Sequence, residues 1–150
     1  FILPVDFSNN KSSSIKSNLE TAREAKQHLL SGGAIIIFPS GSVSTAKNIR
    51  SEAKDDNWKN FPAKLIQQTK TDVIPIYFDG KNGLLFHIFA SKMKNQTLKY
   101  SSYIHETRKK IGKEIIIYSG TKIKYDEISH IKSRQELTKY LKDITYSLKK

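Results

Sequence analysis

The stretch that most constrains the fold covers residues 32–45 and reads GGAIIIFPSGSVST. Two successive glycines are typical of a helix end. The apolar run 34–38 shows no polar alternation, which predicts a strand buried on both faces, as in a parallel sheet. Pro39, Ser40 and Gly41 then predict a turn at the carboxyl end of that strand, where α/β proteins bind ligands. Hydroxyl side chains and backbone N–H groups at such a turn favour an anion or another polar headgroup.

The order of predicted elements along the chain favours an α/β fold. Apolar runs predict strands at residues 1–7, 34–38, 73–78 and 114–118, and helical patterns occupy residues 17–31, 62–69, 84–93, 98–110 and 133–148. Strands that alternate with helices imply right-handed crossovers, so we expect a mostly parallel sheet flanked by helices. In that topology the loops after the second and third strands lie at the same edge of the sheet.

Two helix starts carry a local signal. Ser17 with Glu20, and Ser133 with Glu136, have the spacing of a capping box. The serine-rich residues 8–16, which precede the first of these helices, are predicted to form a loop.

The chain is strongly basic, with a formal net charge of +12. A charge of this size indicates an anionic partner and says little about the fold. Nucleic acid, an anionic membrane surface and an acidic carrier protein are candidates, and a plain lysine-rich solvated surface also fits. Nucleic acid is the least favoured, because no helix-turn-helix or RNA-recognition signature occurs and aromatic residues are not interleaved with basic ones along the strands.

Several kinds of catalytic site are absent from the sequence. Ser44 stands where a G-x-S-x-G nucleophile elbow needs its second glycine. No phosphate-binding or dinucleotide-binding glycine motif occurs, and the chain has no cysteine. The histidines lack metal-ligand spacing, and they are His28, His87, His105 and His130. We therefore expect no bound metal or cofactor, and no apolar run is long enough to span a bilayer.

The ordered motifs of this chain resemble those of the glycerolipid acyltransferases, which are lysophospholipid or 1-acylglycerol-3-phosphate acyltransferases. Residues 38–44 (FPSGSVS) match the family's Phe-Pro-x-Gly block, and residues 73–76 (VIPI) match its Val-x-Pro block. Residues 1–7 are similar to the strand that precedes Phe-Pro-x-Gly. The similarity is greatest to the branch labelled as hemolysins, which also contains lyso-ornithine-lipid acyltransferases. Further residues that match this branch are Trp58, Phe61, residues 79–82, Glu106, Lys110 and Gly112.

The resemblance implies acyl transfer in lipid biosynthesis, by a peripheral protein at the cytoplasmic face of a membrane. The donor would be an acyl carrier protein or coenzyme A thioester, used as co-substrate. The acceptor would be a lysolipid of the lysophosphatidic acid or lyso-ornithine lipid type.

The family's catalytic His-x-x-x-x-Asp motif does not occur here, since none of the four histidines has an aspartate five positions later. The chain begins with Phe1 inside a predicted strand and not with Met. We therefore expect residues 1–150 to be the C-terminal portion of a single acyltransferase-like domain whose general base lies upstream. On its own this portion is expected to be inactive, and no catalytic residue is assigned to it.

The resemblance assigns acceptor binding to the turn after the second predicted strand. The expected headgroup-binding residues are Phe38, Pro39, Ser40, Gly41, Ser42, Ser44, Lys47 and Arg50, with Ile74 and Pro75 as a supporting motif. Many family members have Glu at the position of Ser40, and at the position of Val43 an Arg that contacts a headgroup phosphate. Lys47 or Arg50 would then supply the charge, and the acceptor need not be a lysophosphatidic acid.

Other functions also fit the sequence. A non-catalytic remnant would bind lipid or a protein partner, and a basic module would bind nucleic acid. A candidate patch for a membrane or an acidic carrier protein consists of Lys99, Tyr100, Tyr103, Ile104, Arg108, Lys109 and Lys110. The same pattern fits a solvated helix face.

Overall fold

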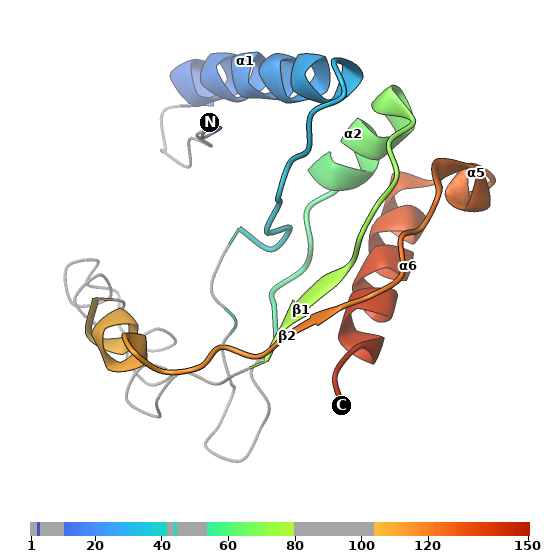
Figure 1. Cartoon of the computed structure of the whole chain (residues 1–150). Helices are drawn as coiled ribbons and strands as arrows, with labels where there is room; N and C mark the ends of the chain where they lie inside the picture. The colour runs from blue at the N-terminus through green and yellow to red at the C-terminus, as the bar shows by residue number, and fades with distance from the viewer. Residues whose placement is uncertain (1–2, 4–10, 42–43, 45–53, 80–103) are drawn as a thin grey trace. The chain divides into compact units, whose positions relative to one another are not determined.

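A computed structural model describes residues 3, 11–41, 44, 54–79 and 104–150 of the chain. Its labelled elements are α1 (Lys11–Leu30), α2 (Phe61–Thr69), β1 (Ile76–Phe78), β2 (Ile117–Ser119), α5 (Tyr125–Ile128) and α6 (Arg134–Ser147) (Figure 1). Residues 104–110 are also helical. The chain divides into a first unit of Phe1–Pro39, Lys59–Ile74 and Lys122–Tyr140 and a second of Ser40–Trp58, Pro75–Thr121 and Leu141–Lys150.

The first unit is built mainly from helices. Helix α1 contacts α2, and the amide of Gln67 on α2 donates to the carbonyl oxygens of Ile131 and Lys132, at 3.2 and 3.0 Å. The buried apolar residues of this unit are Ala25, Ala63, Leu65, Ile66, Ile123, Ile128 and Leu137. Because removal of apolar surface from water is the main favourable term in folding, this cluster is the core of the unit.

Helix α1 begins earlier than the sequence predicts. It starts at Lys11, so the predicted loop is wrong for residues 11–16, and Ser17 lies inside the helix and does not cap it. Serine costs a helix interior less than about 0.7 kcal/mol relative to alanine, which tertiary context overrides. The predicted end is confirmed, since the Gly33 N–H donates to the His28 carbonyl at 2.9 Å and Gly32 has a φ of 86°.

The helices expected over residues 62–69 and 133–148 are confirmed by α2 and α6. The Ser133 hydroxyl accepts the Glu136 N–H at 3.3 Å, so Ser133 caps α6 as its spacing predicts. Of the helix expected at 98–110, residues 104–110 are helical. Residues 98–103 and the helix expected at 84–93 lie outside the described residues.

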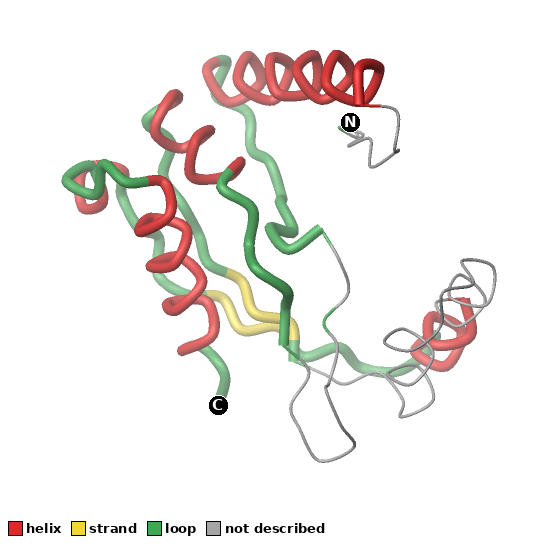
Figure 2. Tube along the Cα trace, turned by 180° about the vertical axis from the view of Figure 1, so that it is seen from behind, coloured by secondary structure: helices red, strands yellow, loops and turns green. Residues whose placement is uncertain are grey.

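The strand pairing that the structure describes is antiparallel. In the second unit, β1 pairs with β2 so that Tyr77 lies opposite Tyr118 (Figure 2). Strand β1 covers the last three residues of the run predicted at 73–78, and β2 overlaps the run predicted at 114–118 at residues 117 and 118 and ends one residue later. The mostly parallel sheet stays a prediction, because residues 1–7, apart from Leu3, are outside the described part of the chain.

Residues 34–38 run without regular secondary structure (Figure 1). Ile36 is 78% exposed and Phe38 is 69% exposed, so the prediction of a strand buried on both faces is wrong here. An apolar run favours burial, but its sequence does not reveal which partner covers it. Within the described residues, no strand pairs with residues 34–38.

Three tyrosine rings contact one another in the second unit. The Tyr77 and Tyr118 rings stack with their centroids 6.5 Å apart, and Tyr146 of α6 meets Tyr77 edge-on at 5.8 Å. The Gly120 N–H donates to the Pro75 carbonyl at 2.9 Å. A Cβ at Gly120 would lie 2.8 Å from Pro75 Cγ, so this close approach requires a glycine.

Candidate functional site

The turn expected after residue 38 is present at Pro39, Ser40 and Gly41. Gly41 has a φ of 65°, a left-handed conformation that glycine adopts without a steric penalty. Ser40 is buried, with 7% of its surface exposed. Among the described residues no buried side-chain polar atom lacks a hydrogen-bond partner. The Ser40 side chain is therefore buried and hydrogen-bonded, whereas an ordinary loop serine faces solvent.

The carboxylate of Asp55 joins Ser44, three residues beyond Gly41, to the only tryptophan of the chain. The Ser44 hydroxyl donates to one carboxylate oxygen, and the Trp58 indole N–H donates to the other at 2.8 Å. A carboxylate can accept several hydrogen bonds at once. One side chain thus connects two points on either side of residues 45–53.

Helix α6 holds Asp55 through its backbone. The Asp55 N–H donates to the Tyr146 phenol oxygen at 3.0 Å. The Lys142 ammonium donates to the carbonyl oxygens of Asp55 and Asp56, at 3.4 and 3.2 Å, and lies 5.8 Å from the centre of the Tyr146 ring. Burial raises the pKa of Tyr146 above its ordinary value, so the phenol stays neutral near pH 7.

The other predicted site residues that the structure describes belong to both units. Pro75 is buried beside Gly120 in the second unit. In the first unit Ile74 is 54% exposed, and the Pro39 carbonyl accepts the Lys59 N–H at 2.9 Å. Ser42, Lys47 and Arg50, together with Val43, lie outside the described residues.

Asp55, Lys142 and Tyr146 were not identified from the sequence. Asp55 stands three residues before the only tryptophan and shortly after the turn in the sequence. This position was the available clue to Asp55. Tyr146 lies 91 residues from Asp55 along the chain. No local spacing rule connects residues at such a distance, so the sequence did not indicate that α6 binds Asp55.

The described histidines do not join this site. His28 covers Gly33, where a Cβ would lie 2.3 Å from the imidazole Nε2. His105 and His130 are exposed. In the part of the chain that the structure describes, no group of three or more His, Cys, Asp or Glu residues could hold a metal ion.

The chain is similar to two lipid acyltransferases. A protein of Phocaeicola vulgatus named lyso-glycine lipid O-acyltransferase is 26% identical over 151 residues, which cover 97% of this chain and 51% of the relative. A protein of the same name from Bacteroides thetaiotaomicron is 30% identical over 119 residues, covering 76% of this chain and 43% of the relative. The chain thus spans about half the length of these curated relatives. No family model and no solved structure matches it.

These similarities support an acyltransferase family, in agreement with the resemblance that the motifs predict. Both relatives are named for O-acylation of a lysolipid. Within the described residues, no helix combines the length and apolar character needed to cross a membrane.

Proposed function

We propose that this chain is the C-terminal portion of a lipid O-acyltransferase that moves an acyl chain from a thioester to a hydroxyl of a lysolipid. The observation that carries this is the similarity to a lyso-glycine lipid O-acyltransferase over 97% of the chain. The turn at Ser40 and Gly41 supports it, because a buried serine and a left-handed glycine occupy the Phe-Pro-x-Gly block.

In this reaction the acceptor hydroxyl oxygen attacks the thioester carbonyl carbon. A C–O bond forms, the C–S bond breaks, the hydroxyl proton passes to a general base and the thiol leaves. We place that base in a His-x-x-x-x-Asp motif outside residues 1–150. The role proposed for this chain is to bind and orient the acceptor at Ser40, Gly41 and Ser44. Holding the acceptor in a reactive geometry lowers the entropic part of the activation barrier. The proposed donor is an acyl carrier protein or coenzyme A thioester.

We propose an amino-acid lysolipid as the acceptor, in preference to lysophosphatidic acid. Val43 stands where many glycerolipid acyltransferases have the arginine that contacts a phosphate, and valine offers no charge or hydrogen-bond donor. Both relatives are named for a lyso-glycine lipid. A glycine headgroup presents a carboxylate, which backbone N–H groups and hydroxyl side chains can bind.

An acyl-transfer assay on the complete gene product that carries this chain tests the proposal. We expect ester formation on lyso-glycine lipid or lyso-ornithine lipid at least about tenfold faster than on lysophosphatidic acid, because one hydrogen bond to a charged headgroup contributes roughly 1.5–3 kcal/mol. Each acceptor is offered with an acyl carrier protein donor and with a coenzyme A donor.

Residues 1–150 alone serve as the control, and they are expected to transfer nothing. Absence of transfer to every lysolipid by the complete product would refute the proposal. Lysolipid binding without transfer would instead identify a non-catalytic remnant.

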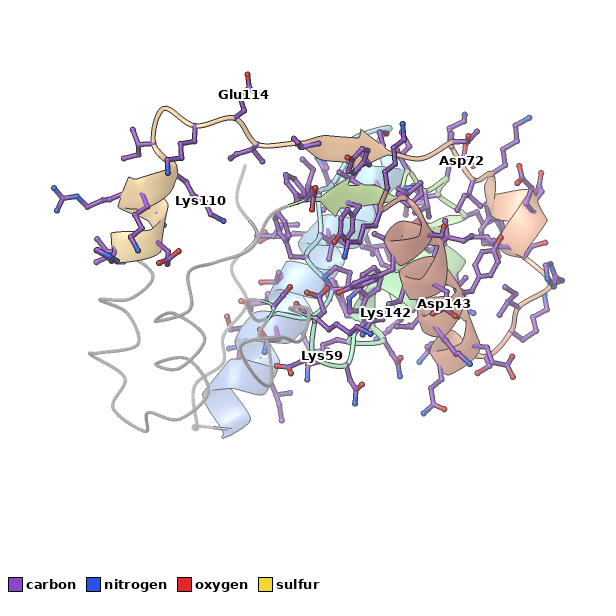
Figure 3. The ribbon with its side chains drawn as sticks, turned by 90° about the horizontal axis from the view of Figure 1, so that it is seen from below. Lys59, Asp72, Lys110, Glu114, Lys142 and Asp143 are labelled. Carbon is purple, nitrogen blue, oxygen red and sulfur yellow. The ribbon has the colours of Figure 1, made fainter. Side chains whose placement is uncertain are left out.

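We also propose that residues 104–117 contact an anionic membrane surface. On the helical part, Ile104, Arg108 and Lys110 are exposed, while Glu106 is buried and paired with Lys109 at 3.2 Å. The segment that follows is exposed up to β2, and Figure 3 shows the Glu114 side chain pointing away from the ribbon. Its exposed isoleucines are Ile111, Ile115, Ile116 and Ile117. Exposed apolar side chains beside basic ones are typical of membrane interaction sites.

Replacement of Ile111 and Ile115 by serine is expected to lower the partition of the protein onto anionic vesicles by at least about tenfold, since a buried isoleucine contributes roughly 1.5–3 kcal/mol. Flotation with phosphatidylglycerol-rich vesicles measures this. Ile15→Ser is the matched control, because Ile15 is 59% exposed on α1. Equal binding of the double variant and the control would contradict the proposal.

A further inference from the structure

We infer that Asp55 is a positioning residue for the acceptor-binding turn, an inference that rests on the proposed function. Its carboxylate accepts the Ser44 hydroxyl and the Trp58 indole N–H together. Because Ser44 is three residues beyond Gly41, the chain keeps their Cα atoms within about 11 Å of each other. Fixing Ser44 therefore restricts where the turn at Ser40 and Gly41 can lie.

The bonds of the Asp55 carboxylate to Ser44 and Trp58 are distinct from the bonds that its backbone makes. The backbone N–H and carbonyl bind Tyr146 and Lys142 on α6. A change confined to the side chain leaves these backbone contacts in place, so the link to α6 survives. The change removes the shared acceptor for Ser44 and Trp58, together with the influence of the carboxylate on the Tyr146 phenol. The expected consequence is a loosened turn on an otherwise folded unit.

This separation predicts a specific kinetic signature. The contacts of Asp55 are to Ser44, Trp58 and α6, so we expect its loss to act on the acceptor through Ser44. We expect Asp55→Ala to raise the KM for the lysolipid about tenfold, the size of effect that an unpaired polar group produces. The kcat and the KM for the acyl donor are expected to stay within about twofold of the parent values, because uniform binding is lost and the reaction step is untouched.

Trp58 supplies a readout that does not depend on activity. It is the only tryptophan in residues 1–150, and it donates to Asp55 itself. Titration of this chain with lyso-glycine lipid below its micelle concentration, followed by tryptophan fluorescence, gives the dissociation constant. Circular dichroism on the same samples shows whether the helices are retained.

Two further variants separate positioning from structure. In Asp55→Asn the amide oxygen can accept from Trp58 and the amide N–H can donate to the Ser44 oxygen, so this variant is expected to restore binding to within about threefold of the parent. Asp143→Asn removes the same charge from an exposed site on α6 (Figure 3) and is expected to change nothing.

Weaker lysolipid binding in Asp55→Ala, with helicity retained and binding restored in Asp55→Asn, would support the inference. Unchanged binding in Asp55→Ala would overturn it. A loss of helicity in both variants would also overturn it, because the role of Asp55 would then be structural. If the complete product transfers no acyl chain, the proposed function fails, while the fluorescence titration still decides whether Asp55 positions a lysolipid site.

Discussion

Alanine in place of the histidine of the expected His-x-x-x-x-Asp motif should lower acyl transfer by the complete gene product by about 10²–10⁴-fold. The acceptor hydroxyl then has no positioned base to take its proton as it attacks the thioester. The initial rate of ester formation on lyso-glycine lipid measures the effect.

Binding of the lysolipid is the internal control of this experiment. If the acceptor turn at Ser40 and Gly41 is the binding element, the histidine variant keeps the dissociation constant of the parent protein. A variant that retains the parental rate would show that the base lies elsewhere. A variant that loses rate and lysolipid binding together would show that the histidine also holds the acceptor.

Leu137→Ala is expected to lower the free energy of unfolding by about 2–5 kcal/mol. Leu137 lies on α6 and is 1% exposed, so alanine removes buried methyl groups and leaves a cavity in the core of the first unit. Urea unfolding followed by circular dichroism measures the change.

Leu30→Ala is the matched control, since Leu30 is 61% exposed at the end of α1. Its expected change lies within about 0.5 kcal/mol, as for most surface substitutions. Equal destabilisation by the two variants would contradict the assignment of Leu137 to the core.

Features that depend on neighbours in the sequence were predictable. The two glycines after α1 and the Ser133 cap of α6 each act within one helical turn. The same holds for the turn at Ser40 and Gly41, where a proline, a small residue and a glycine stand in succession. A helix end or a turn satisfies its own backbone groups locally, so its residues carry the signal.

The start of helix α5 depends on a residue that is distant in the sequence. Its first N–H group, on Tyr125, is bound by the side chain of Asp72 at 2.9 Å, 53 residues earlier. That hydrogen bond and the ion pair with Lys122, at 3.1 Å, hold the pKa of Asp72 below its ordinary value. A local partner also exists, because the Glu127 carboxylate accepts the Lys124 N–H at 3.3 Å. The acceptor for the Tyr125 N–H is distant in the sequence, so the start of this short helix depends partly on tertiary structure.

The turn at Ser40 and Gly41 thus followed from residue types and spacing alone, because backbone conformation responds to the nearest side chains. The attachment of Asp55 to Tyr146 and the antiparallel pairing of Tyr77 with Tyr118 were decided only in the folded chain. Hydrogen bonds and ring contacts between distant residues depend on which segments meet. Many residues of the chain could form the same type of hydrogen bond or ring contact, and tertiary packing decides which of them meet.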